Sequence, residues 1–254
     1  MIMFVDYLAF QEVLLVFAVA LVGYVAVLSY VAMRRNDAAG LKSTLKSGAV
    51  PIGGVGAIAT ILGIWGEVAW PLPGSYNILF TDIYLIFGLT LVLLAVSMAA
   101  SLKLQYVGLF AFVAGGITIA YGWNGYQLGM TKDPLETFLL FGSFGLAAIL
   151  SFPATVAVDH FLAHPDGTAF ATRTPAAVAR RRPSLSGASR AVQPVVPETS
   201  SGTPDSELSF RERFHLPIYV NVMVLAFVVM VALAAIAALW YLDVTLPAHL
   251  ANAP

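Results

Sequence analysis

Cysteine is absent from this chain, and charged residues are scarce. None of the 254 residues is a cysteine, which excludes disulfide bonds, thiol catalysis and metal centres held by thiolates. Asp, Glu, Lys and Arg make up 11% of the chain, against about 25% in ordinary soluble domains, and hydrophobic residues make up 59%. A soluble fold with this composition lacks the polar side chains to cover its surface.

Long apolar runs take the place of the missing charge. Each run comes close to the ~20 residues that cross ~30 Å of hydrocarbon as a helix. The apolar residues do not alternate with polar ones, which excludes a membrane β-barrel. We therefore predict an all-α membrane bundle of six transmembrane helices, at about 13–33, 48–66, 83–102, 104–122, 137–158 and 217–242.

Basic residues are missing from one side of this predicted bundle. Twelve of the 13 Lys and Arg residues fall in segments that share a side, and Lys132 alone falls on the other. The positive-inside rule places the twelve in the cytoplasm. We expect a multi-pass protein of the cytoplasmic (plasma) membrane with both termini and two aromatic loops, 67–82 and 121–136, outside.

Three regions follow from composition. Residues 1–162 form a predicted five-helix transmembrane core, and 163–208 form a disordered cytoplasmic linker rich in Arg, Pro and Ser. Residues 209–254 hold a short lead-in helix, the sixth transmembrane helix and an outer tail. Ser184, which follows three arginines, is a candidate phosphorylation site, although the arginines also simply retain topology or bind anionic lipid.

An internal repeat is suggested at the start of two predicted helices. The segments 82–88 and 136–142 share the pattern acid-x-aromatic-Leu-(Ile/Leu)-Phe-Gly, 54 residues apart. One interpretation is a duplicated helical hairpin, repeated in parallel about an axis along the membrane normal. The alternative is coincidence between two apolar segments of low complexity.

The chemistry that the sequence offers lies in the two outer loops. No ionisable residue falls in the middle of a predicted helix, which argues against a proton-coupled pump. Carboxylates and aromatics in the loops could bind a solute or a hard cation, whereas helix capping explains Asp82, Asp133 and Glu136, and an interfacial belt explains the aromatics. Glu67 follows a helix end, where capping does not explain a negative charge. The candidate ligand-binding residues are Glu67, Trp70, Tyr76, Asn77, Asp82, Trp123, Asn124, Tyr126 and Glu136.

A metal site is only weakly indicated. His160 and His164 share a helical face at spacing i, i+4, but polar residues before a Pro-Asp-Gly sequence are also ordinary helix-stop features. The sequence indicates no cofactor.

The outer loops resemble those of an uncharacterised family, the "domain of unknown function 981" proteins of archaea and some bacteria. The resemblance is carried by 70–77 (WPLPGSYN) with Phe80 and Asp82, and by 129–136 (GMTKDPLE), and it covers about residues 3–161. It implies a multi-span membrane protein and brings no activity with it.

Our leading hypothesis is a non-enzymatic membrane protein whose outer loops bind or pass a small solute, or dock a membrane partner complex or a second copy. The alternative is a membrane enzyme or redox accessory subunit with a metal held by outer carboxylates. A third reading is a signalling protein phosphorylated at Ser184. Beyond the lipid bilayer the sequence names no partner, and it gives no sign of nucleic-acid binding.

Overall fold

The computed structural model describes residues 7–164 and 218–251, and the regular secondary structure in these ranges is all helical. Six of the described helical segments are long and apolar enough to cross a membrane, which confirms the predicted number. In chain order the elements are α1 (Tyr7–Arg34), α2 (Ala38–Ala69), α3 (Ser75–Asn77), the π-helical turn η1 (Ile78–Asp82), α4 (Ile83–Ala99), α5 (Gln105–Gln127), α6 (Pro134–Ala163) and α8 (Ile218–Ala251). The predicted linker beyond residue 164, the lead-in helix and Ser184 lie outside the described residues.

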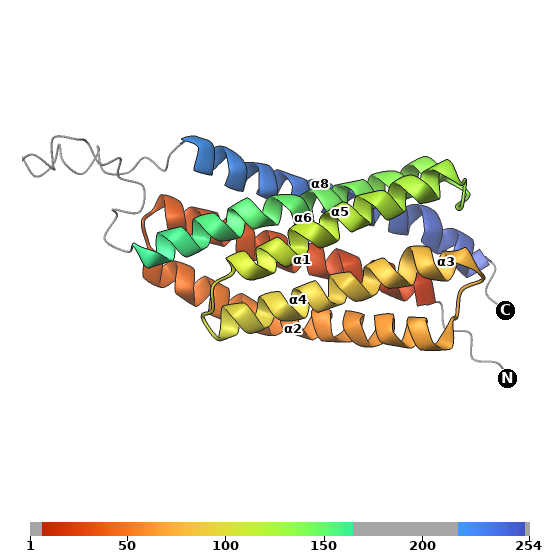
Figure 1. The fold of residues 1–254 in the computed structure, drawn as a ribbon, viewed down its shortest axis with the longest axis horizontal. Coiled ribbons are helices and arrows are strands. Elements are labelled where there is room, and N and C mark those ends of the chain that lie inside the picture. The colour runs from red at the N-terminus through yellow and green to blue at the C-terminus, as the bar shows by residue number, and fades with distance from the viewer. Residues whose placement is uncertain (1–6, 165–217, 252–254) are drawn as a thin grey trace, which may run out of the picture.

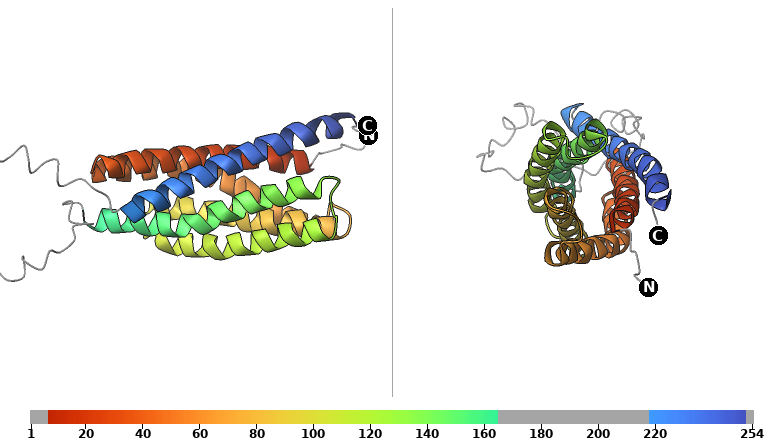
Figure 2. Two further views of the ribbon diagram at one scale, coloured as in Figure 1. Left: turned by 90° about the horizontal axis from the view of Figure 1, so that it is seen from above. Right: turned by 90° about the vertical axis from the view of Figure 1, so that its right-hand side faces the viewer.

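The long helices form a closed ring. Neighbours around the ring are α1, α2, α4, α5, α6 and α8, and α8 packs against α1 again. Figure 1 shows the helices running side by side, and the end-on view in Figure 2 shows the ring. Helix α1 begins and α8 ends at the end of the ring where α3 lies (Figure 1). We call this end of the ring the α3 end, and the opposite end the turn end. Large apolar side chains such as Phe17, Ile61 and Val96 are exposed, which is compatible with a membrane protein.

Glycine lets the helices of two hairpins approach closely. A Cβ on Gly63 of α2 would lie 2.7 Å from the Cα of Leu85 in α4, and one on Gly88 would lie 2.5 Å from the backbone nitrogen of Thr60. The α5–α6 pair meets in the same way at Gly115 and Gly145. Inside lipid the hydrophobic effect does not drive helices together, and association depends on close packing. Small residues at the contacts allow the helix backbones to approach closely.

Most of the helices extend beyond the predicted spans at one end or both, although α4 ends at Ala99, before the predicted end at 102. Helix α2 begins at Ala38, where Asp37 Oδ1 accepts a hydrogen bond of 2.7 Å from the Gly40 amide. It continues to Ala69, so Glu67 lies in its last turn. Most of the predicted loop 67–82 is helical, because the chain turns back at 70–74 and coiling resumes at Ser75. Helix α5 likewise extends to Gln127, and only residues 128–133 separate it from α6.

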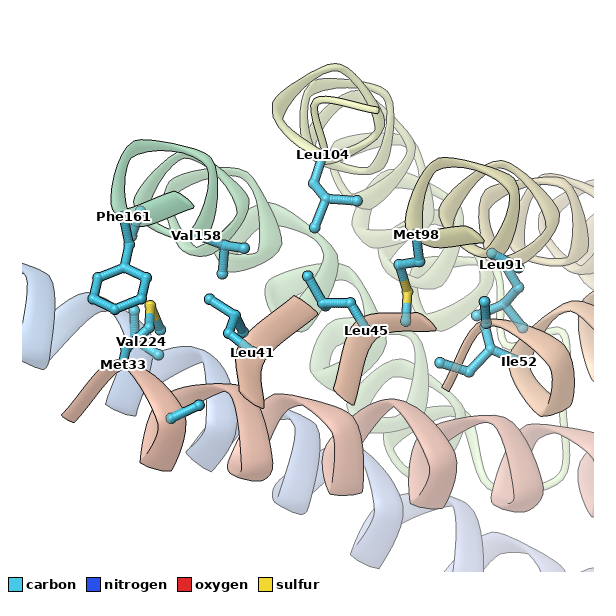
Figure 3. Close-up of a cluster of buried hydrophobic side chains, with 14 of the residues drawn as sticks. Met33, Leu41, Leu45, Ile52, Leu91, Met98, Leu104, Val158, Phe161 and Val224 are labelled. Carbon is cyan, nitrogen blue, oxygen red and sulfur yellow. The ribbon is translucent and has the colours of Figure 1, made fainter. Parts of the chain in front are cut away.

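Apolar side chains close the turn end of the ring. Figure 3 shows side chains of this cluster converging from several helices, with Leu41 of α2 fully buried among them. Next to the cluster, Asp159 of α6 caps α5: its carboxylate accepts hydrogen bonds from the Leu104 amide at 3.0 Å and the Gln105 amide at 2.8 Å. This cap satisfies amides that the start of a helix leaves unpaired. The labelled members of the cluster are Met33, Leu41, Leu45, Ile52, Leu91, Met98, Leu104, Val158, Phe161 and Val224.

Candidate functional site

The connection between α2 and α4 is a hydrogen-bonded cap at the α3 end. Trp70 takes a left-handed conformation (φ 47°) and its amide bonds the Gly66 carbonyl, which ends α2. Asn77 then ties the connection to the helix: its Nδ2 donates to the same carbonyl at 3.1 Å, and its Oδ1 accepts from the Leu72 amide at 3.3 Å. Asn77 is completely buried, whereas Trp70 and Tyr76 are exposed. The structure therefore gives Asn77 a holding role and leaves the two aromatic residues at the surface.

Two of the candidate acids come together. Glu67 of α2 lies beside Asp82, the last residue of η1, and we call these two side chains the carboxylate pair. Asp82 Oδ2 accepts a hydrogen bond of 2.8 Å from the Tyr121 hydroxyl of α5. Glu67 Oε1 is buried, and no described residue bonds it. The π-helical turn inserts an extra residue into the helix, a feature often found at functional sites, and it positions Asp82 opposite α2. Like charges at this range repel, so a cation near the pair would stabilise it.

Buried polar residues on α1 adjoin the carboxylate pair. The Tyr7 hydroxyl donates to the Leu62 carbonyl of α2 at 2.9 Å, and its ring packs against Trp65 with centroids 5.1 Å apart. One turn further on, Gln11 is 3% exposed, and its Nε2 has no hydrogen-bond partner among the described residues. Glu12, which the sequence placed in an outer segment before the first helix, is a buried residue of α1. Tyr7 and Gln11 were not among the predicted site residues.

The acid at the start of α6 belongs to a different part of the α3 end. Asp133 occupies the N-cap position with Pro134 next, as predicted, but its side chain makes no capping bond to the helix. Glu136 Oε2 is buried and is not bonded by any residue of the described ranges. Tyr241 of α8 lies close to Thr137 and within range of the charges of Glu12 and Glu136. Glu136 is therefore grouped with α8 and α1, and not with Glu67 and Asp82.

Aromatic residues on the helices that flank the second connection pack on one another. Trp123, Tyr126 and Phe138 form a triangle with ring centroids 5.6 to 5.9 Å apart, and both Trp123 and Tyr126 are exposed. The Asn124 side chain donates to the Ala120 carbonyl of its own helix at 2.8 Å. Exposed Trp and Tyr near a helix end match the aromatic belt of membrane proteins.

A cavity runs along the axis of the ring. It has a volume of about 270 Å³, and its wall includes residues of α1, α2, α4, α5, α6 and α8. Its floor at the turn end is the apolar cluster, through Met33, Leu45 and Leu104. At the α3 end its wall carries polar groups: Gln11, Glu12, Tyr84 and Tyr241. Tyr84 is 4% exposed and its hydroxyl, like Gln11 Nε2, finds no partner in the part of the chain described.

Most other polar residues of the cavity wall bond their own helices; Ser29, whose Oγ has no partner among the described residues, is an exception. The Thr90 hydroxyl donates to the Ile86 carbonyl of its own helix at 2.7 Å. Thr118, Ser151 and Thr155 make the same kind of bond, at 2.6 to 2.8 Å. Such bonds leave mainly apolar surface toward the cavity. The cavity therefore has a polar part at the α3 end and a mainly apolar part, which we call the shaft, between the polar part and the floor.

The two candidate metal ligands lie at the far end of α6. The imidazoles of His160 and His164 are 4.8 Å apart between centroids, and His164 Nδ1 lies 3.1 Å from the His160 carbonyl oxygen. Within the described ranges, no three His, Asp or Glu side chains gather closely enough to hold a metal ion together.

These observations define an all-helical protein with six described helices that are long and apolar enough to cross a membrane, arranged around an axial cavity. The family model of DUF981, described as a protein of unknown function, matches residues 1–169. The chain belongs to this family, as the resemblance of its two loops predicted. No curated protein and no solved structure matches it.

Proposed function

We propose that this chain is a multi-pass protein of the cytoplasmic membrane that binds a small molecule inside its helix ring without catalysing a reaction. The observation that carries the proposal is the axial cavity, which has at one end buried polar groups that no described residue bonds. Buried polar atoms are normally hydrogen-bonded, and exceptions call for an explanation such as a bound molecule. The apolar floor at the turn end favours binding over passage of a hydrophilic solute, because a polar solute would lose its hydration there.

In this proposal the α3 end faces the outside of the cell. The support is the distribution of basic residues: Arg34, Arg35 and Lys103 lie at the turn end, and Lys132 is the single basic residue expected at the other end. The carboxylate pair, Trp70, Tyr76, Trp123 and Tyr126 would then surround the outer mouth of the ring. Their role would be to admit or select the molecule, which retains the predicted outer-loop surface in a more specific form.

The test is to find the bound molecule. Protein purified in mild detergent would be extracted with organic solvent, and the extract analysed by mass spectrometry. We expect a compound in close to equimolar amount that is missing from an unrelated membrane protein purified in the same way.

Two alanine positions on α5 provide a matched pair of variants. Ala111 lines the cavity and is buried, whereas Ala120 is exposed on the outside of the ring. Ala111→Phe fills the cavity and should abolish copurification of the compound, and Ala120→Phe should leave it unchanged. Equal amounts in both variants, or no compound above the background in the wild type, would contradict the proposal. Metal analysis of the same preparation tests the alternative of a metal held by the outer carboxylates.

A further inference from the structure

We infer that the axial cavity takes a neutral, single-chain lipid whose terminal oxygen lies between Gln11 and Tyr84. This inference rests on the proposed binding function and names the class of ligand. Four features of the cavity lead to it: its shape, its apolar wall, the position of its free polar atoms and the charge around them.

The shape of the cavity excludes a bulky ligand. On α1 its wall extends from Leu8 to Met33, which corresponds to roughly 38 Å at 1.5 Å per residue. Its volume of about 270 Å³ is nevertheless below the ~300–1,000 Å³ of pockets that hold drug-sized molecules. A long space with so little volume is narrow. It suits one extended hydrocarbon chain and is too small for a phospholipid with two chains.

The wall of the shaft suits hydrocarbon. Between the polar end and the floor it is formed by residues such as Val22, Phe87, Leu94, Ala111 and Phe144. The hydroxyls of Thr90, Thr118, Ser151 and Thr155 are bonded to carbonyls of their own helices. A polar chain would therefore find few partners in the shaft, whereas a hydrocarbon chain loses none.

Two free polar groups mark the place of the head group. Gln11 and Tyr84 are both residues of the cavity wall and both are at least nine-tenths buried, and neither Gln11 Nε2 nor the Tyr84 hydroxyl has a hydrogen-bond partner in the described residues. Both side chains lie near Tyr7, which places them at the same end. Ser29 Oγ is also unpartnered in the described chain, but a serine hydroxyl can rotate onto a carbonyl of its own helix. The Tyr84 hydroxyl lies too far from its own backbone to do so, and the Gln11 side chain lies close to the Tyr7 hydroxyl, which already donates to the Leu62 carbonyl.

The chemistry of these groups selects an uncharged oxygen. An amide NH₂ and a phenol both donate hydrogen bonds, so the ligand must present an acceptor. An anionic head is disfavoured because Glu12 lines the same end and Glu67 lies close to Tyr7. A cationic head offers no acceptor to Gln11 Nε2, which can only donate hydrogen bonds, and so leaves it unsatisfied. The hydroxyl of a long-chain alcohol, or the carbonyl of a neutral lipid, meets all these conditions.

The test uses photoaffinity labelling of the full-length protein in phosphatidylcholine vesicles. The probe is hexadecanol that carries a diazirine on its chain, and the comparison probe is hexadecanoic acid with the same diazirine. We expect the alcohol probe to label the protein saturably, with competition by unlabelled hexadecanol, and the acid probe to label much more weakly. Labelled peptides should come from the cavity wall.

Tyrosine variants isolate the head-group contact. Tyr84→Phe removes one oxygen and should weaken competition by hexadecanol about fivefold, as expected for a single neutral hydrogen bond. Tyr106→Phe, on the exposed face of α5, should leave competition unchanged. Tyr84→Phe should also raise the melting temperature of the empty protein, because an unsatisfied buried hydroxyl destabilises it, while it reduces the shift that hexadecanol produces. Gln11→Leu should behave like Tyr84→Phe.

The outcomes separate this inference from the proposed function. If the acid probe labels as well as the alcohol, or if Tyr84→Phe and Gln11→Leu compete like the wild type, the inference is overturned. If solvent extraction still yields a bound compound of another class, binding in the ring stands and only the ligand class fails. If neither probe labels and no compound copurifies, the proposed function fails as well.

Discussion

The close contact between α5 and α6 gives the sharpest prediction about the ring. A Cβ added to Gly115 would lie 2.5 Å from the Gly145 carbonyl oxygen and 3.0 Å from Ala148 Cβ. An ordinary carbon–oxygen contact is about 3.3 Å, so the shortfall is about 0.8 Å. A backbone oxygen cannot rotate away as a side chain can. Gly115→Ala must therefore push the two helices apart.

The expected cost can be bracketed. Overpacking of this kind costs about 1–3 kcal/mol, and alanine in place of glycine within a helix returns about 0.5–1 kcal/mol. Gly115→Ala should thus lower the free energy of unfolding by about 1 kcal/mol, and by at most about 2.5 kcal/mol. Gly116 is the matched control, because no described atom other than its chain neighbours and the backbone of its own helix lies within 4 Å of its added Cβ. Gly116→Ala should stabilise by about 0.5–1 kcal/mol.

The assay is thermal unfolding of both variants in the same detergent. A difference of about 2 kcal/mol between them corresponds to a gap of roughly 4–8 °C in melting temperature for a chain of this size. Gly115→Ala should melt below the wild type and Gly116→Ala at or above it. Equal melting temperatures, or the reverse order, would refute the packing of α5 on α6 described here.

Two further predictions concern the ends of the helices. Asp159→Ala removes both acceptors that cap α5, so it should destabilise the protein by about 2 kcal/mol and speed hydrogen exchange at Leu104 and Gln105. Asp159→Asn keeps one acceptor, so its stability should fall between those of the wild type and Asp159→Ala. Unchanged hydrogen exchange in Asp159→Ala would contradict the cap. Asn77→Ala breaks two bonds within the α2–α4 connection and should cost about 2 kcal/mol with faster proteolysis at 70–74. Tyr76→Ala, at the neighbouring exposed position, should change stability by less than about 0.5 kcal/mol, and equal effects of the two variants would count against the holding role of Asn77.

Composition predicts the long helices well and their ends poorly. The apolar runs stand out in a chain with so few charges, so the number of long helices follows directly from the sequence. The ends fall outside these runs, where polar residues such as Lys42 and Lys46 extend a helix without an apolar signal. A single asparagine, Asn77, decides the path of the connection through two bonds that depend on the folded chain.

The cavity and its polar end could not be read from the sequence. They depend on the order of helices around the ring, which the sequence alone leaves open. The spacing of Tyr7, Gln11, Leu14 and Ala18 at i, i+4, i+7 and i+11 is one available signal, since it places Tyr7 and Gln11 on the buried face of α1. The hairpin duplication remains a prediction: Gly88 packs against α2, whereas Gly142, its counterpart in the repeat pattern, meets no described atom within 4 Å.

The most direct test of the account is the orientation of the ring in the membrane, because the proposed entry for the ligand depends on it. The chain has no cysteine, so each introduced cysteine is the single thiol. In intact cells, a membrane-impermeant maleimide should label Ser75→Cys and Lys132→Cys at the α3 end, and should label Arg35→Cys and Lys103→Cys at the turn end only after the cells are opened. Labelling of Arg35→Cys and Lys103→Cys in intact cells, with Ser75→Cys and Lys132→Cys protected, would contradict the account.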